Sequence, residues 1–480
     1  MKLRDILNGI EITELHADMD MEITGVDSDS RKAAPGRMFV AVEGFESDGH
    51  KFIPSAVNAG AVCVLCRKAP ECDVPYVITP NTRRGLAVAS ANMLGRPADK
   101  MKIIGVTGTN GKTTTTNLVK TIIEKCLGAK VGLIGTNGNM IGDIELHTER
   151  TTPESNELQE LFAKMYDAGC EYVVMEVSSH ALFLDRVYGI TFEAAVFTNL
   201  TEDHLDFHPT MEDYGKAKAI LFTMCRKGAV NIDDEYAHLM LEAATAPILK
   251  YSMSDSAAEL HAEDVVLHDD SVSFTAVYNN EKCNASLAIP GKFSVYNALS
   301  AISAAIMLGI ELKSAVAALA QCHGVMGRAE VVPTGRDFTI IIDYAHTPDA
   351  LENIISTVRG IARGRVVTLF GCGGDRDSKK RPIMGSIAAE KSDFVIVTSD
   401  NPRTEEPGAI INDILQGMQD TKTPYVVIEN RREAIGWAIK NAQPRDIIIL
   451  AGKGHETYQI LGREKVHFDE REVVAEYLSE

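Results

Sequence analysis

Short hydrophobic runs alternate with helix-like stretches along most of the chain and fall into three blocks. The first block, residues 1–98, contains the strand-like runs RMFVAVEG, AVCVLCR and PYVITP. The second block, residues 99–326, opens with a strand, a glycine loop and a helix. It continues with KVGLIGT, YVVMEVSS, AAVFTNL and GAVNIDD before the helix YNALSAISAAIMLGI. Strands that alternate with helices in this way are typical of a largely parallel α/β sheet.

The third block, residues 327–480, repeats a strand-then-helix pattern. Its strands lie in FTIIIDYAHTP, RVVTLFGCGGDRD, DFVIVTSDNPR, YVVIEN and DIIILAGKGHE. Continuous Val and Ile runs are typical of strands that are buried on both faces of a doubly wound sheet. The chain is therefore predicted to be an α/β protein of three domains: a small α/β domain, a central mostly parallel sheet and a C-terminal Rossmann-like doubly wound sheet.

Four of the five strands of the third block end in a polar, charged or glycine-containing tail. The tails begin at Asp343, Gly371, Asp400 and Gly452. Ligands of open α/β sheets bind outside the carboxyl ends of the strands, so we expect the tails to meet at one site. Four unrelated loops are the alternative. In the DNPR tail, Pro402 stiffens a turn that presents an arginine beside an amide and a carboxylate, as a clamp for a ligand with both charges would.

The run IIGVTGTNGKTTTTNLV places a glycine loop between a strand and a helix. In such loops, glycines let backbone N–H groups approach phosphate oxygens, a lysine reaches the terminal phosphates and a hydroxyl ligates Mg²⁺. The helix adds its positive dipole end. A strict P-loop would have glycine where Val106 stands, so this loop is a compact variant. The predicted nucleotide loop comprises Gly108, Thr109, Asn110, Gly111, Lys112, Thr113 and Thr114.

Three side chains outside this loop are candidates for a metal site. Glu176 ends the strand YVVMEVSS, where a carboxylate would lie beside the loop as a Mg²⁺ ligand. His204 lies among acids in TNLTEDHLDFH, for which a solvated acidic loop is the alternative. The residues alone favour a helix-surface position for Lys218.

Composition narrows the classes of function. A net charge of −19 argues against a broad nucleic-acid surface. No apolar run reaches the roughly 18 residues of a membrane span, and Asp5 and Glu11 interrupt any signal peptide. Nine cysteines in so long a chain do not indicate a disulfide framework, and Cys63 and Cys66 are expected to be packed thiols rather than zinc ligands. We therefore expect a cytoplasmic protein without a nucleic-acid or membrane partner.

The motifs TGTNGKT, MEVSSH, TNLTEDHLD, YxxAK, GRAE, DYAHTP, GCGGDRD, DNPRTEEP and AGKGHE run from residue 105 to 456. Together they resemble the Mur ligase family, the ATP-dependent amino-acid ligases of peptidoglycan precursor synthesis. The resemblance implies that the first block binds the UDP end of a nucleotide sugar, the second binds ATP with two Mg²⁺ ions, and the third binds an amino acid. It also implies a CO₂-derived carbamate on Lys218, which would serve the second Mg²⁺ together with His204. A bare ammonium has no lone pair for a metal.

Within the family, DNPRTEEP most resembles the members that add meso-diaminopimelate to UDP-N-acetylmuramoyl-L-alanyl-D-glutamate. Members that add L-lysine commonly lack its arginine. The resemblance implies that Arg403 takes the distal carboxylate in a bidentate pair, with Glu456 opposite the distal ammonium. Lysine would leave Arg403 desolvated and unpaired. The implied clamp comprises Arg376, Asp400, Asn401, Pro402, Arg403, Gly452 and Glu456.

Other positions take their roles from the same resemblance. The UDP end would be held by Ser28, Ser30, Phe45, Glu46 and Ser47, and the muramoyl-dipeptide arm by Thr151, Thr152, Ser178 and Arg186. Adenine would meet Asn297, the γ-phosphate Arg328, and the ribose Asp343, with His346 nearby. The implied metal ligands are Thr113, Glu176, His204 and Lys218, and the implied catalytic residues are Lys112, Lys218, His204 and Arg328. Arg150 and Leu184 depart from the residues common in relatives, which leaves the contacts of the dipeptide arm open.

The resemblance implies a reaction through an acyl phosphate, in a monomer whose third block closes on its second. Three alternatives stay open. The first is the L-lysine-adding ligase of the same family. The second is folylpolyglutamate synthetase, which lacks a UDP-binding block. The third, from another class, is a nucleotide-dependent switch or binding protein that joins nothing.

Overall fold

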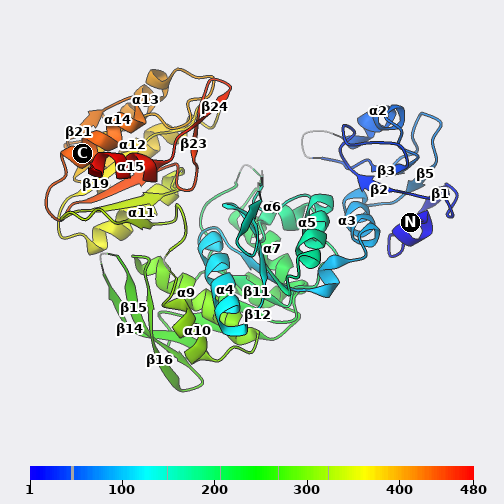
Figure 1. Cartoon of the computed structure of the whole chain (residues 1–480), viewed down its shortest axis with the longest axis horizontal. Helices are drawn as coiled ribbons and strands as arrows, with labels where there is room; N and C mark the ends of the chain where they lie inside the picture. The colour runs from blue at the N-terminus through cyan, green and yellow to red at the C-terminus, as the bar shows by residue number, and fades with distance from the viewer. Residues whose placement is uncertain are drawn as a thin grey trace. The chain divides into compact units, whose positions relative to one another are not determined.

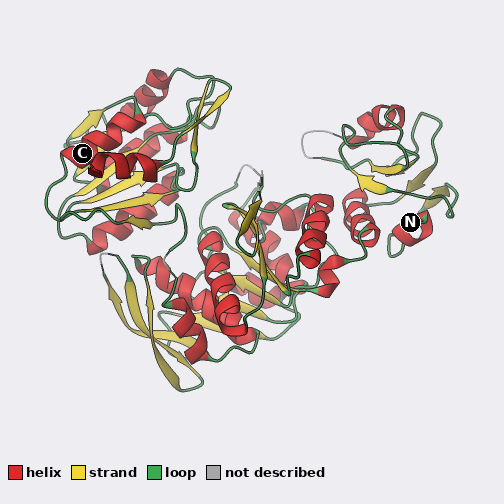
Figure 2. Ribbon diagram, viewed as in Figure 1, coloured by secondary structure: helices red, strands yellow, loops and turns green. Residues whose placement is uncertain are grey.

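The computed structural model describes residues 1–44, 48–146, 148, 150–205, 207–268, 270–322 and 324–479 (Figure 1). The chain forms two compact units. The first contains Met1–Leu260 and Ser300–Ala315, and the second contains His261–Leu299 and Val316–Glu480. Both units combine strands with helices (Figure 2). The three block boundaries expected from the sequence stay a prediction.

A small sheet with the strand order β1-β5-β4-β3-β2 lies in the first hundred residues. Only β1 runs antiparallel to its neighbour. The strands are β1 (Glu14–His16), β2 (Gly25–Asp27), β3 (Arg37–Val40), β4 (Cys63–Cys66) and β5 (Tyr76–Ile78). The helices are α1 (Leu3–Ile6), α2 (Ile53–Asn58) and α3 (Thr82–Met93), with the 3-10 turns η1 (Gly49–Phe52) and η2 (Pro97–Lys100).

The strand β4 is buried along its whole length because both of its faces are covered. Cys63 and Leu65 pack with residues of α1 and α3, whereas Val64 and Cys66 pack with residues of α2. Burial raises the pKa of the Cys63 thiol to about 12 and that of Cys66 to about 11. The prediction of packed thiols is confirmed for Cys63 and Cys66, and no disulfide joins cysteines of the described residues.

The central sheet of the first unit has the order β13-β12-β11-β6-β10-β7-β8-β9. It is parallel from β13 to β7, as predicted, and ends in the antiparallel strands β8 and β9. The strands are β6 (Lys102–Thr107), β7 (Val131–Gly135), β8 (Gly138–Ile141), β9 (Ile144–Leu146), β10 (Tyr172–Glu176), β11 (Ala194–Phe197), β12 (Gly228–Asn231) and β13 (Ile248–Ser252).

Amphipathic helices supply the core of this sheet. On α5, Leu158, Phe162 and Met165 recur at helical spacing and are buried in one cluster with Met175 of β10. The helices are α4 (Lys112–Leu127), α5 (Ser155–Asp167), α6 (Ser179–Phe183), α7 (Met211–Ala219) and α8 (Ala237–Ala243), with the 3-10 turn η3 (Ile220–Thr223). The helices α9 (Lys292–Met307) and α10 (Leu312–Leu319) run through the residues at which the two units divide.

The second unit contains a six-stranded sheet with the order β17-β18-β22-β19-β20-β21. All neighbours from β18 to β21 are parallel, and β17 is an antiparallel edge. The strands are β17 (Glu330–Val332), β18 (Thr339–Asp343), β19 (Val366–Phe370), β20 (Phe394–Val397), β21 (Tyr425–Val427) and β22 (Ile447–Ala451). The same unit holds β14 (Leu260–Leu267), β15 (Val272–Tyr278) and β16 (Glu281–Leu287), and the hairpin β23 (Tyr458–Leu461) and β24 (Glu464–His467).

Helices cover this sheet and bury its Val and Ile runs. Residues of α14 and α15 share one hydrophobic cluster with Ile340, Leu369 and Ile448. The helices are α11 (Pro348–Ile361), α12 (Lys380–Lys391), α13 (Pro407–Gln416), α14 (Arg431–Lys440) and α15 (Glu470–Ser479). No helix within the described residues is long and apolar enough to cross a membrane.

Candidate functional site

The predicted phosphate loop, residues 108–114, connects β6 to α4 in the first unit. Gly108 has φ +150° and Gly111 has φ +83°, a backbone that favours glycine. A Cβ on Gly108 would lie 1.9 Å from Thr198 Oγ1, so the loop passes directly against the end of β11. Gly111 precedes α4, and the first N–H groups of a helix together with its dipole make an anion site.

The segment after β11 holds the loop in shape. The backbone N–H of Thr109 donates to Asn199 O at 2.8 Å, and that of Asn110 donates to Asn199 Oδ1 at 2.9 Å. Thr198 Oγ1 donates to Asn110 O at 2.6 Å. Asn199 and Thr198 were not among the predicted site residues. Their signal was the polar tail TNLT directly after an apolar strand.

Two lysines meet at one carbonyl of this loop. Lys112 Nζ donates to Gly108 O at 2.9 Å and to Thr109 O at 2.7 Å, and Lys218 Nζ donates to Gly108 O at 2.8 Å. Lys218 is 1% exposed, so its interpretation as a helix-surface lysine, favoured by the residues alone, is wrong. Burial, and then the charge of Lys112, holds the pKa of Lys218 well below its usual value.

Tyr214 connects Lys218 to the loop and to His204. Its hydroxyl accepts a hydrogen bond from Thr109 Oγ1 at 3.2 Å, and Lys218 Nζ lies 4.3 Å from the centre of its ring. The ring of His204 stands edge-on to it with 6.0 Å between centroids and also contacts the ring of His180 at 4.8 Å. The structure therefore brings His204 and Lys218 to the same tyrosine. The YxxAK motif could have indicated the contact between Tyr214 and Lys218, because residues four apart lie on the same face of a helix.

Glu176 lies one strand away from the loop, at the end of β10 and level with Val106 of β6. It is 1% exposed, and its carboxylate accepts hydrogen bonds from Thr136 N at 2.9 Å and Thr136 Oγ1 at 3.1 Å. A Cβ on Gly135 would lie 2.4 Å from Glu176 Oε1, so glycine is needed beside it. The carboxylate is thus fixed near the phosphate loop.

Three of the predicted dipeptide-arm residues lie around Glu176. Thr152 Oγ1 donates to Glu176 O at 2.9 Å and accepts from the backbone N–H of Ser178 at 3.1 Å. Thr151 Oγ1 lies 3.0 Å from Thr136 Oγ1. The fourth residue, Arg186, donates to Thr152 O at 3.1 Å and pairs with Glu154 at 2.7 Å. Sequence reasoning missed Glu154, which also pairs with Arg83 at 3.6 Å.

The predicted UDP residues are only partly described. Ser28 and Ser30 are half-buried directly after β2, whereas Phe45, Glu46 and Ser47 lie outside the described residues. Nearby, Glu43, Asp48 and His50 are close enough to one another to hold a cation. However, Arg67 already donates to Glu43 Oε2 at 2.7 Å and to His50 Nε2 at 2.9 Å. We therefore assign no metal there.

In the second unit, the four strand tails converge as predicted. The backbone N–H of Gly452 donates to Asp343 O at 3.0 Å. A Cβ on Gly452 would lie 2.8 Å from Asp400 Oδ2 and 3.9 Å from Gly371 O, and a Cβ on Gly371 would lie 3.0 Å from Asp400 N. Tails that follow different strands thus form one site at the carboxyl edge of the sheet.

The GRAE segment packs beside these tails and brings Arg328 to Asp343. Asp343 Oδ2 accepts from Ala329 N at 2.7 Å, and burial raises the pKa of this carboxyl while the charge of Arg328 opposes the rise. The guanidinium of Arg328 lies 5.1 Å from the ring centre of Tyr344. His346 is exposed three residues after Asp343, and Asn297 is buried in α9.

Two charged side chains of the predicted clamp have polar atoms that could bind a ligand. Arg403 Nη1 donates to Gly374 O at 2.8 Å, and its Nε and Nη2 have no partner in the described part of the chain. Glu456 Oε2 accepts from Asn401 Nδ2 at 2.9 Å and Lys453 Nζ at 3.0 Å, whereas its Oε1 has no partner among those residues. Burial raises the pKa of the nearby Tyr458; the charge of Glu456 adds to the rise and that of Arg403 opposes it. This arrangement fits a group that carries a carboxylate and an ammonium.

The loops that carry Arg376 and Pro402 are held together. Gly374 N donates to Asn401 O at 2.9 Å, and a Cβ on Gly374 would lie 1.9 Å from Pro402 O. Behind them, the buried Arg381 pairs with Glu405 and Asp413, both at 2.9 Å. The side chain of Arg376 is exposed at the rim. Sequence reasoning missed Arg381 because its position in α12 does not indicate which loops its side chain contacts.

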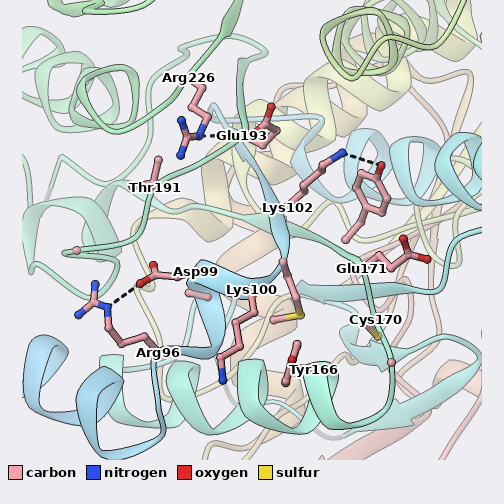
Figure 3. A pocket seen from close by; sticks show the side chains of 15 residues that line it. Arg96, Asp99, Lys100, Lys102, Tyr166, Cys170, Glu171, Thr191, Glu193 and Arg226 are labelled. Carbon is pink, nitrogen blue, oxygen red and sulfur yellow. Dashed lines mark hydrogen bonds and ion pairs between the residues drawn. The ribbon is translucent and has the colours of Figure 1, made fainter.

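A groove of about 990 Å³ lies at the other end of the central sheet (Figure 3). Lys102, the first residue of β6, lines it, so the groove is at the amino end of the strand that leads into the phosphate loop. Arg96 pairs with Asp99 at 2.6 Å, and Arg226 pairs with Glu193 at 3.5 Å. The charged side chains of the groove thus largely compensate one another. The phosphate loop is therefore a stronger anion site than the groove.

Known proteins match the chain along its whole length. Family models match the Mur ligase family catalytic domain at residues 22–100, the middle domain at 106–305 and the glutamate ligase domain at 327–454. A Clostridium tetani protein named UDP-N-acetylmuramoyl-L-alanyl-D-glutamate–2,6-diaminopimelate ligase is 46% identical over 100% of both chains. A protein of that name from Caldanaerobacter subterraneus is 48% identical over 100% of this chain and 99% of its own. A solved structure of a ligase so named is 32% identical, with a TM-score of 0.74 over 100% of this chain and 99% of that one. The chain belongs to the Mur ligase family.

Proposed function

We propose that this chain is an ATP-dependent ligase that joins meso-diaminopimelate to UDP-N-acetylmuramoyl-L-alanyl-D-glutamate in peptidoglycan precursor synthesis. Full-length relatives at 46% and 48% identity carry the name of this activity. The observation that carries the choice of amino acid is the open clamp. Two guanidinium nitrogens of Arg403 and one oxygen of Glu456 have no partner in the described residues. The distal head of diaminopimelate offers a carboxylate to the first and an ammonium to the second.

ATP would bind at the phosphate loop, where the N-terminus of α4 and the ammonium of Lys112 favour an anion. Thr113 and Glu176 would hold one Mg²⁺ ion, and His204 with Lys218 would hold a second. Bound Mg²⁺ neutralises the phosphates as the phosphoryl group transfers. The fixed carboxylate of Glu176 beside the loop is a donor of the hard oxygen type that Mg²⁺ prefers.

A carbamate on Lys218 fits the electrostatics of its surroundings. Burial and Lys112 lower the pKa of Lys218, so more of it is the neutral amine whose lone pair can attack CO₂. The new N–C bond releases a proton and leaves an anion on Lys218. A repulsive contact between two ammonium groups at Gly108 O would thereby become an attractive one with Lys112.

The reaction would proceed in two steps. The γ-carboxylate of the D-Glu residue attacks the γ-phosphorus of ATP, the bond to the bridging oxygen breaks, and ADP leaves. The neutral amine of diaminopimelate then attacks the acyl carbon, phosphate leaves, and the amine loses a proton. Lys112 and Arg328 would neutralise the transferring charge, and positioning would supply most of the rate.

The remaining assignments rest on the family resemblance. Ser28, Ser30, Phe45, Glu46 and Ser47 would bind the UDP end, and Thr151, Thr152, Ser178 and Arg186 the dipeptide arm. Asn297, Asp343 and His346 would bind the adenosine of ATP. We also propose the domain boundaries 1–98, 99–326 and 327–480, a monomer, and a cytoplasmic location.

An ADP-release assay tests the proposal. The purified protein receives ATP, the UDP-linked dipeptide, and meso-diaminopimelate, L-lysine or L-ornithine in separate reactions. We expect ADP release in the reaction with diaminopimelate and not in those with lysine or ornithine. Of the three amino acids, only diaminopimelate has a distal head that pairs with both Arg403 and Glu456. Equal rates with lysine would favour the L-lysine ligase of the same family. ADP release that needs neither the dipeptide nor an amino acid would favour a nucleotide-dependent switch.

A further inference from the structure

Lys453 is a buried lysine within the amino-acid clamp. It follows Gly452 in the tail of β22, and its side chain is 0% exposed. Its ammonium donates to Asn401 Oδ1 at 3.0 Å and to Glu456 Oε2 at 3.0 Å. One bond reaches the tail of β20 and the other stays within its own tail, so Lys453 ties the two tails together.

A buried ammonium is unfavourable unless it is both paired and hydrogen-bonded. Lys453 meets this condition through the carboxylate of Glu456 and the amide oxygen of Asn401. Because Lys453 has no exposed surface, it cannot touch a ligand in this arrangement. Any influence it has on the amino acid acts through those two neighbours.

The amide of Asn401 can take only one orientation in this network. Its Oδ1 accepts from Lys453 Nζ and from the backbone N–H of Ile460, both at 3.0 Å. The reversed amide would turn its NH₂ group toward two donors. Nδ2 is therefore aimed at Glu456 Oε2, which it reaches at 2.9 Å. Two donors hold Oε2, and Oε1 is the oxygen of Glu456 without a partner in the described residues.

We propose that Lys453 is a positioning residue that fixes Glu456 so that its Oε1 receives the distal ammonium of the amino acid. This inference rests on the proposed function and adds to it the residue that prepares the carboxylate. With Lys453 in place, Glu456 is held in one orientation before the ligand arrives, so its side chain loses little freedom on binding. Without Lys453, Oε2 keeps only the hydrogen bond from Asn401 Nδ2, and the carboxylate rotates more freely.

The test compares meso-diaminopimelate with 2-aminopimelate, which keeps both carboxylates and the reacting amine but lacks the distal amine. In Lys453→Met, we expect kcat/KM for diaminopimelate to fall by about tenfold to a hundredfold, through KM, as misplaced binding groups do. The preference for diaminopimelate over 2-aminopimelate should fall toward one, and KM for ATP should change less than about twofold. Lys465→Met is the matched control, since Lys465 is exposed on the adjoining hairpin and lies 3.5 Å from the ring centre of Tyr458.

Equal losses with both amino acids, at an unchanged preference, would overturn the inference, because Lys453 would then only support the fold. If Lys453→Met does not fold, Lys453→Met/Glu456→Gln removes both ions of the buried pair and is compared with Glu456→Gln alone. The inference expects the same preference in these two variants, and a further loss in the double variant would overturn it. A wild-type protein that forms no product with diaminopimelate would refute the proposed function itself.

Discussion

Lys112 Nζ and Lys218 Nζ donate to the same atom, the carbonyl oxygen of Gly108, at 2.9 and 2.8 Å. Burial lowers the pKa of Lys218, and the charge of Lys112 lowers it further. A lowered pKa favours the neutral form of Lys218, whose lone pair can attack CO₂. The positive groups that make the loop a site for anions are therefore Lys112 and the N-terminus of α4.

The first prediction concerns stability. In CO₂-free buffer, Lys218→Met should raise Tm at pH 7, and the gain should shrink as the pH approaches 10. A lysine whose pKa falls on folding binds fewer protons in the folded state, so its contribution to stability grows as pH rises. Its penalty is largest at low pH and is gone above the unfolded value of about 10.4. Calorimetric scans across this pH range measure the effect.

Lys216→Met is the control for that experiment. Lys216 lies on the same helix but is exposed and pairs with Glu212 at 2.7 Å, so no gain should appear. A gain for Lys218→Met that is equal at pH 7 and pH 10 would show that its charge is not the cause.

The second prediction concerns activity. Lys218→Ala should lose ligase activity by at least about a hundredfold, since it removes the carbamate that would hold the second Mg²⁺ ion beside the transferring phosphoryl group. Short-chain carboxylic acids should restore part of it by supplying the missing anion. Product formation is measured with and without added acetate. Full activity in Lys218→Ala would rule out the carbamate.

The third prediction concerns the loop backbone. Gly108→Ala should weaken ADP binding and destabilise the fold by about 2 kcal/mol or more, because its Cβ would lie 1.9 Å from Thr198 Oγ1 and its φ is +150°. Calorimetric titration with ADP and thermal unfolding measure the two effects.

Gly128→Ala serves as its control. Gly128 follows the other end of α4 at φ +64° and would meet nothing within 4 Å, so we expect a cost of about 1 kcal/mol and normal ADP binding. Normal ADP affinity in Gly108→Ala would contradict the tight contact.

The fourth prediction concerns the choice of amino acid. Arg403→Ala should lower kcat/KM for diaminopimelate by at least about thirtyfold, corresponding to about 2 kcal/mol for a desolvated charge pair, while KM for ATP stays within about twofold. Arg403→Lys should not restore it, because an ammonium cannot make the two-pronged pair. Arg359→Ala, at an exposed arginine of α11 that pairs with Asp393, is the control. If Arg403→Ala weakened the use of ATP as much as that of diaminopimelate, Arg403 would not be the residue that binds the distal carboxylate.

Much of the fold was predictable because burial on both faces leaves a direct mark in the sequence. The strands β19, β20 and β22 read as apolar runs since helices cover both sides of a doubly wound sheet. Their tails were expected to meet because parallel strands end at one edge, and the contact of Gly452 with Asp400 confirms it. The phosphate loop was recognisable from glycines between a strand and a helix.

The burial of individual cations was not predictable. Lys218 and Gly108 are separated by 110 residues, and only the folded chain brings them together. Lys453 lies in the AGKGHE motif, but the motif does not show that its ammonium is buried against Asn401 from another strand tail. Arg381 is likewise paired with Glu405, which lies beyond the next strand. A lysine on a helix is ordinarily exposed, so a pattern-based interpretation assigns it to the surface.

The sequence by itself determined the α/β elements, the position of the phosphate loop, the edge at which the strand tails meet and, through its motifs, the family. Those features depend on local spacing and on hydrophobic periodicity, which neighbouring residues encode. Only the tertiary structure decided which charged side chains are buried. It also decided which oxygen or nitrogen atoms of those side chains lack a hydrogen-bond partner in the described residues. Desolvation and hydrogen-bond partners come from segments that are distant along the chain, and no local pattern specifies them.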